Sequence, residues 1–117
     1  MRVRQCSEVP AANVTMEGAA GCRIRWLIGE ADQAPNFLMR EFEVAPGGHT
    51  PKHIHDYEHE VYVLAGRGLG VSAEGEAPIR RDDAILLPAN EMHCLKNTGR
   101  GVLRFMCLVP LRGEDTP

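Results

Sequence analysis

Short apolar segments, separated by glycine, proline and polar residues, recur along the whole chain of 117 residues. No segment of helical length repeats its apolar residues every three or four positions, as an amphipathic helix would. The segments are instead rich in residues that favour strands, and turn residues interrupt them at close spacing. This pattern predicts an all-β fold.

Eight segments are expected to form strands: residues 22–28, 37–44, 59–65, 69–72, 77–80, 84–87, 92–96 and 102–108. The run Ala45-Pro46-Gly47-Gly48 predicts a turn that ends the second strand, and Glu74-Gly75 predicts a hairpin turn. Residues 31–36 are expected to form a loop, and the polar tail 112–117 to be flexible. Many short strands predict a sandwich or a barrel, and periodicity alone does not choose between them.

Four of the five histidines fall into two groups, with His53, His55 and His59 in the first and His93 in the second. Residues two apart on a strand point to the same face, roughly 6.6–7 Å from each other. His59 would lie ~13 Å beyond His55 on a straight strand, so the chain must bend at residues 56–58. Because imidazole is a common ligand of transition metals, the pattern predicts a metal site.

Two longer motifs contain these histidines. Gly47-x5-His53-x-His55-x3-His59-x6-Gly66 resembles the first motif of the cupin family, with His59 in the place of a usual glutamate. Asp82-x5-Pro88-x-Asn90-x2-His93-x3-Asn97 resembles the second motif, with Asp82 and Asn90 in the places of two glycines. Asparagine tolerates a left-handed backbone better than other side chains do, so Asp82 is the larger departure.

The resemblance covers about residues 47–66 and 82–97, and it implies a single-domain cupin jelly-roll barrel, or double-stranded β-helix, over residues 1–117. It implies one divalent transition metal per chain inside the barrel, held by His53, His55, His59 and His93. Segments 34–37, 57–61 and 105–110 are also similar to small manganese-binding bacterial cupins. Manganese is therefore the metal expected first, with iron, nickel, zinc or copper as alternatives.

The resemblance further implies a metal-dependent oxygenase or oxidoreductase of dioxygenase type, acting on a small organic substrate. Two alternatives stay open: a non-catalytic module that binds or senses a small molecule or a metal, and a metal-assisted isomerase. The sequence offers no obvious general base beyond the four histidines, which disfavours the isomerase. No catalytic residue is assigned.

Several neighbours of the histidines have a predicted orientation. Glu60 should face away from the site, since it follows His59 on a strand. Alternation along the last strand places the Cys107 side chain inside the barrel. There it is either an inert packing residue or a functional thiol, which would contact the metal ligands or face the substrate. His49 lies outside the motif register and is expected at the surface. The carboxylates of Asp56, Glu58 and Glu60 are candidates for orienting the imidazoles.

Charge and composition exclude several classes of function. The net charge of −3 is spread along the chain, which disfavours nucleic acid as a partner. No apolar run reaches the ~18 residues of a membrane span. The cysteines Cys6, Cys22, Cys94 and Cys107 are widely spaced and follow no secretory signal, so we expect reduced thiols in a cytoplasmic protein. Exposed sheet edges favour a homodimer.

Overall fold

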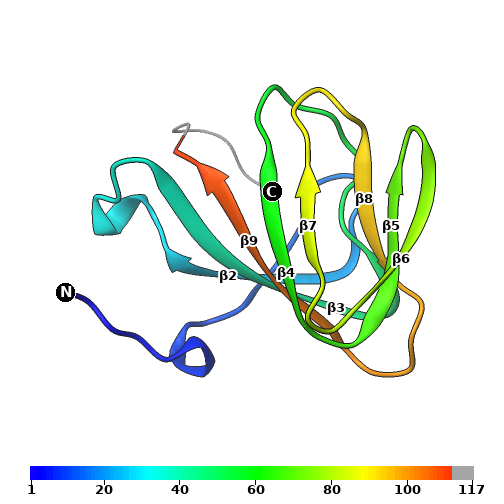
Figure 1. Cartoon of the computed structure of the whole chain (residues 1–117). Coiled ribbons are helices and arrows are strands. Elements are labelled where there is room, and N and C mark those ends of the chain that lie inside the picture. The colour runs from blue at the N-terminus through cyan, green and yellow to red at the C-terminus, as the bar shows by residue number, and fades with distance from the viewer. Residues whose placement is uncertain (112–117) are drawn as a thin grey trace.

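The computed structural model describes residues 1–111, and strands make up almost all of its regular structure (Figure 1). In chain order these are β1 (Ala12–Asn13), β2 (Ala20–Ile28), β3 (Phe37–His49), β4 (His59–Ala65), β5 (Arg67–Ser72), β6 (Gly75–Arg80), β7 (Ala84–Leu87), β8 (His93–Asn97) and β9 (Leu103–Pro110). Two 3-10 turns, Cys6–Glu8 and Glu30–Asp32, complete the described part. The expected all-β fold is confirmed, while the predicted flexible tail lies outside the described residues.

The strands form one antiparallel sheet in the order β6-β5-β8-β3-β9-β4-β7, with β2 also pairing to β3 and β1 to β2. In Figure 1 the sheet curls, so that β4 and β7 stand in front of the long strands β2 and β3. Strands distant in sequence become neighbours in this arrangement. In particular β3 pairs with both β8 and β9, which brings the two histidine motifs to the same interior.

The inner face of the curled sheet is apolar. Phe42 on β3 stacks on Phe105 on β9 with ring centroids 5.2 Å apart, and Val44, Val63 and Leu103 are fully buried beside them. Burying one such side chain contributes roughly 1.5–3 kcal/mol, so this cluster is a main source of stability. Phe42 and Phe105 of this cluster also line the interior cavity of the barrel.

The turn predicted at residues 45–48 is wrong, because β3 continues through it to His49. Gly47 has a φ of 81°, and the pairing of β2 with β3 shifts register between Ala20 and Cys22. Gly47 and Gly48 therefore lie in a β-bulge, at which the strand bends without ending. The extra length places His49 opposite Lys96 on β8.

The two substituted positions of the second motif adopt the backbone that glycine would. Asp82 has a φ of 73° and Asn90 a φ of 64°, both in the left-handed region. The Asn90 N–H donates to the carbonyl oxygen of His55 at 2.7 Å, and the Asp82 N–H donates to that of Val63 at 2.9 Å. Both turns thus form despite the departures from the motif.

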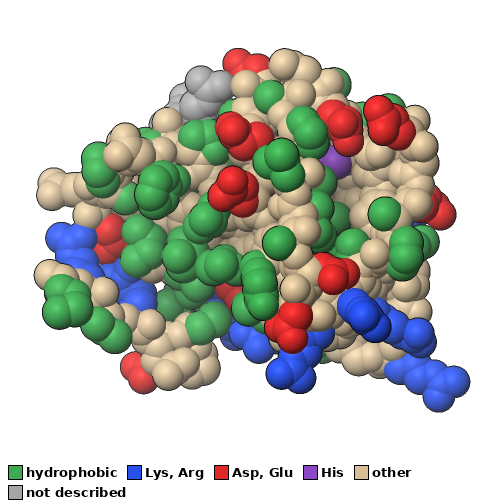
Figure 2. Space-filling model, viewed as in Figure 1, with side chains coloured by type: hydrophobic (Ala, Val, Ile, Leu, Met, Phe, Trp, Pro, Cys, Tyr) green, Lys and Arg blue, Asp and Glu red, His purple; other side chains and the backbone are tan. Residues whose placement is uncertain are grey.

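Apolar side chains also gather on the outer face seen in Figure 2, over β4 and β7. Tyr62 and Leu64 on β4 and Leu86 on β7 are exposed there, with Leu86 retaining 63% of its accessible surface. Such a face suits the homodimer expected from the sequence, which stays a prediction. No helix within residues 1–111 is long and apolar enough to cross a membrane.

Candidate metal centre

Four histidines from three parts of the chain converge inside the barrel. His53 and His55 lie in the segment between β3 and β4, His59 begins β4, and His93 begins β8. One ring nitrogen from each lies within 4.8 Å of those of the other three. The structure therefore brings together all four histidines that the sequence singled out. The chain also bends between His55 and His59, as their spacing required.

Backbone pairing fixes the two motifs relative to each other. The His53 N–H donates to the carbonyl oxygen of His93 at 3.2 Å, and the His93 N–H donates back to His53 at 3.1 Å. The Thr50 N–H reaches the Leu95 oxygen at 3.0 Å, while the Thr50 hydroxyl accepts from the Leu95 N–H at 2.9 Å. These bonds hold Thr50 and His53 against β8.

Backbone carbonyls orient two of the rings. Nδ1 of His55 donates to the carbonyl oxygen of Tyr57 at 2.8 Å, and Nδ1 of His93 donates to that of Glu91 at 3.1 Å. The His55 ring also stacks on the Tyr57 ring, with centroids 3.9 Å apart. With Nδ1 protonated, each ring keeps the lone pair of Nε2 for the centre of the cluster.

The neighbouring side chains agree only in part with the predicted orientations. Glu60 is exposed on the outer face of β4, as alternation predicted, and Glu58 is exposed as well. Carbonyl oxygens hold His55 and His93 where the sequence suggested carboxylates. His49 is half-buried rather than at the surface, and its Nδ1 lies 3.2 Å from the Thr50 oxygen, away from the cluster.

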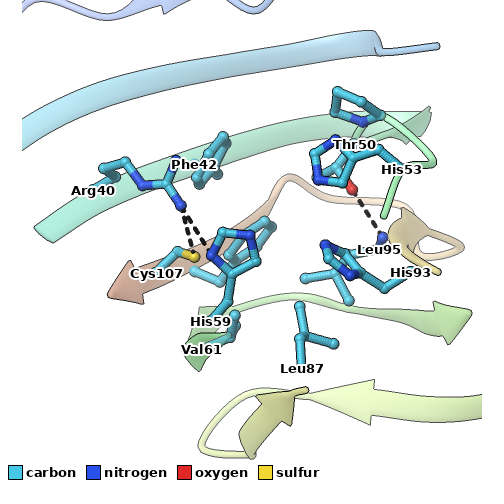
Figure 3. Close-up of a pocket in the computed structure, with 12 residues that line it drawn as sticks. Arg40, Phe42, Thr50, His53, His59, Val61, Leu87, His93, Leu95 and Cys107 are labelled. Carbon is cyan, nitrogen blue, oxygen red and sulfur yellow. Dashed lines mark hydrogen bonds between the residues drawn. The ribbon is translucent and has the colours of Figure 1, made fainter. Parts of the chain in front are cut away.

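A residue that the sequence analysis missed, Arg40 on β3, borders the histidines. Its side chain is only 1% exposed, and Nη2 lies 3.3 Å from His59 Nδ1 and 3.1 Å from Cys107 Sγ (Figure 3). A guanidinium can only donate, so His59 Nδ1 accepts this bond, and the proton of the neutral ring lies on Nε2, which is 2.9 Å from His55 Nε2. His59 Nε2 would therefore bind a metal only after this proton moves to Nδ1 and the contact with Arg40 opens. The pattern did contain a signal: Arg40 is in phase with the buried residues Leu38 and Phe42.

The cavity beside the cluster is small and largely apolar. Its free volume is about 30 Å³, which suits an ion with one or two small ligand atoms. Arg40 and Cys107 stand at one end in Figure 3, and His53 and His93 at the other. The lining consists of Arg40, Phe42, Thr50, Pro51, His53, His59, Val61, Leu87, His93, Leu95, Phe105 and Cys107.

Burial favours the neutral form of three of these imidazoles, those of His53, His59 and His93. It lowers the pKa of His53 to about 4, with smaller contributions from His93, His55 and Arg40. Burial also lowers the pKa of His59 and of His93, and for His59 the Arg40 charge acts in the same direction. Neutral imidazole is the form that ligates a metal.

The donor set fits a divalent transition metal. Imidazole nitrogens bind such ions at about 2.0–2.1 Å, so two ligands on opposite sides of one ion are about 4.2 Å apart. The ligand nitrogens of the four histidines all lie within 4.8 Å of one another, which is close to this span. Oxygen-preferring ions such as Mg²⁺ are disfavoured by four nitrogen donors. The metal's identity stays a prediction.

Comparison with known proteins gives a consistent picture. A family model described as "Cupin domain" matches residues 40–109. The polyketide cyclase RemF from Streptomyces resistomycificus has a similar structure, with a TM-score of 0.90 and 33% identity over 96% of this chain and 80% of RemF. A predicted oxalate decarboxylase from Thermotoga maritima has a TM-score of 0.83 and 27% identity, covering 95% and 100% of the two chains. These likenesses confirm the jelly-roll barrel.

Among curated proteins, "Polyketide synthase CurC" from Streptomyces cyaneus is 39% identical over 56 residues, which is 46% of this chain and 36% of CurC. The chain spans only about half to three-fifths of the length of the first curated relatives it matches. The names found describe several activities, so the relatives share a barrel rather than one reaction.

Proposed function

Because this chain belongs to the cupin family, we propose that it is a metal-dependent enzyme that closes rings in a substrate of polyketide type. The observation that carries this proposal is the four-histidine cluster. It lies in a barrel that matches the polyketide cyclase RemF over nearly the whole of this chain. CurC, named as a polyketide synthase, is a second relative whose name points to the same substrate class.

A polyketide carries ketones on alternate carbons, and ring closure joins a methylene carbon to a distant carbonyl carbon. The methylene loses a proton, the new carbon–carbon bond forms, and the carbonyl oxygen takes up a proton. A divalent ion held by His53, His55, His59 and His93 would supply Lewis acidity toward a carbonyl oxygen.

The chain's own residues would contribute orientation and a dry site. Phe42, Val61, Leu87, Leu95 and Phe105 line the cavity and exclude water from it. In a low-dielectric site, charges act more strongly on a polarised carbonyl than they would in water. The free volume of about 30 Å³ admits only the reacting end of a substrate. The rest would lie outside the inner cavity.

An oxygenase acting on a small organic substrate, as the sequence resemblance implied, is the second candidate. The observation that favours it is the all-nitrogen donor set, which accepts iron and manganese as well as zinc. It differs from ring closure in one measurable respect, because an oxygenase consumes molecular oxygen.

One experiment tests both candidates. Protein loaded with zinc, manganese or iron is incubated with a linear tetraketone that ends in methyl groups, in which a methylene carbon can close a six-membered carbon ring on the far carbonyl, and both products and oxygen are followed. We expect a dihydroxybenzene product lighter than the substrate by one water, no oxygen uptake, and loss of the reaction in His93→Ala. Oxygen uptake with an oxidised product would replace the cyclase by the oxygenase. Binding without turnover would favour the non-catalytic module.

A further inference from the structure

Arg40 is a buried cation for which the described residues provide no anion. Its side chain is 1% exposed, and none of the ion pairs within residues 1–111 includes it. The carboxylate next to it in sequence, Glu41, lies on the opposite face of β3. There Arg25 at 3.1 Å and Arg104 at 2.8 Å hold it. Buried charges in proteins are normally paired, so an unpaired guanidinium is unusual.

The groups that do contact Arg40 leave its charge uncompensated. The rings of Trp26 and Phe42 lie 5.4 and 5.2 Å from its central carbon, which attracts the cation without neutralising it. Cys107 accepts from Nη2 at 3.1 Å, but burial raises the pKa of this thiol more than Arg40 lowers it, so the sulfur stays protonated at neutral pH. His59 accepts as a neutral ring.

The guanidinium also has unused hydrogen-bonding capacity. Its Nε is buried without a hydrogen-bond partner, the one such side-chain nitrogen or oxygen found within residues 1–111. The side chain lines the same cavity as His53, His59 and His93. Leaving a buried donor unpaired is costly, so the described residues leave both the charge and the hydrogen-bonding capacity of this guanidinium incompletely satisfied.

From these observations we infer that Arg40 makes the cavity selective for ligands with an anionic oxygen, either a carboxylate or an enolate. The inference rests on the proposed function for its metal. With a divalent ion on four neutral imidazoles, the cavity would hold the ion's charge and that of Arg40, and the lining found within residues 1–111 contains no carboxylate. An anionic oxygen between the two cations offsets both, and the planar fork of the guanidinium suits it.

The test compares charged and neutral probes on the full chain. Protein with a measured zinc content is titrated by calorimetry with malonate, with its neutral analogue malonamide, and with acetylacetone, which binds as an enolate. We expect malonate or acetylacetone to bind at least about tenfold more tightly than malonamide. The tighter of the two anions identifies the oxygen type. Equal affinity of the parent protein for all three probes would overturn the inference without any variant.

Two substitutions then assign the preference to Arg40. Arg40→Met should weaken binding of the anions at least about tenfold while leaving malonamide unchanged, and Arg40→Lys should retain part of the affinity. Arg23→Met, at an exposed position on β2, is the matched control. Unchanged anion affinity in a folded Arg40→Met protein with parental zinc content would refute the role of Arg40. The neutral variant Arg40→Gln takes its place if Arg40→Met does not fold.

The same titrations separate this inference from the proposed function. If the parent protein takes up no metal, the proposed metal centre fails. The same three probes are then titrated into the metal-free parent and into the Arg40→Met protein, and the difference in affinity still measures the contribution of Arg40. If the parent binds anions through Arg40 but leaves the tetraketone unchanged, the ring-closing function fails and the inference stands.

Discussion

Position 59 is the residue at which this site differs most from the family motif, since a histidine stands where a glutamate is usual. The structure buries His59 to 4% exposure with its ring among the other three, while Glu60 points outward. Four neutral donors leave the full charge of a bound cation in place, whereas a glutamate would offset part of it. The substitution thus makes the cavity more attractive to anions, in agreement with the role inferred for Arg40.

Replacing His59 by alanine should weaken metal binding by about 3 kcal/mol, roughly a quarter of the ~10–16 kcal/mol of a four-ligand site. Glu60→Gln, the neighbouring change on the outer face, should leave metal affinity nearly unchanged. Competition titrations against a chromophoric chelator measure both. The register of the site would be refuted by a Glu60→Gln protein that loses its metal while His59→Ala keeps it.

At the level of elements, the site depends on close contact between strands that are remote in sequence. The pairing of β5 with β8 carries His93 into the barrel, and Gly68 lies at the start of that pairing, opposite Asn97. A Cβ on Gly68 would overlap the carbonyl oxygen of Lys96. Glycine is needed here for the approach of two backbones, since its φ is not in the left-handed region.

Gly68→Ala should therefore destabilise the fold by about 3 kcal/mol or more and lower Tm by roughly 10 °C. The overlap is with backbone, which cannot move aside without disturbing β8. Gly101→Ala is the control, because a Cβ there meets nothing within 4 Å, and its effect should stay within about 0.5 kcal/mol. Thermal unfolding followed by circular dichroism measures both variants. Equal Tm values for the two would show that the β5–β8 contact is looser than described.

The strands themselves were largely predictable, because each apolar segment alternates or is rich in strand-forming residues. What failed was the interpretation of local signals. Residues 45–48 carry strong turn residues, yet tertiary pairing with β2 and β8 keeps the chain in one strand, so the glycines form a bulge. The hairpin turn fell one residue earlier than expected, since Ser72 pairs with Gly75.

For the site, motif spacing identified the four histidines, but nothing in the spacing identified Arg40. A charged residue on a strand is normally assigned to the solvent side, and here the neighbouring Glu41 is buried too. The phase of Arg40 with Leu38 and Phe42 favours the inner face, and the pairing of β3 with β9, which sets Arg40 opposite Cys107, shows that Arg40 faces the cavity. Long-range register of this kind is not encoded in any local pattern.

For the whole molecule, the interior cluster links proton binding to folding. Burial lowers the pKa of His53 to about 4 and shifts those of His59 and His93 in the same direction. An unfolded histidine titrates near 6.5. Between about pH 6.5 and 4 the unfolded chain therefore binds more protons than the folded chain, and the free energy of unfolding falls as the pH falls.

We expect the metal-free protein to lose about 1 kcal/mol of stability from His53 alone between pH 7 and 5, after reduction for its half-exposed ring. His59 and His93 add to this loss. Urea unfolding of metal-free protein at several pH values measures it, and His53→Gln should show a shallower dependence because one of the shifted groups is gone. Asp32, whose pKa Arg4 lowers to about 2, titrates in a more acidic range and does not interfere above pH 4.5. Stability that stayed constant from pH 7 to 5 would mean that the rings of His53, His59 and His93 are solvated in the folded chain, which would contradict their burial.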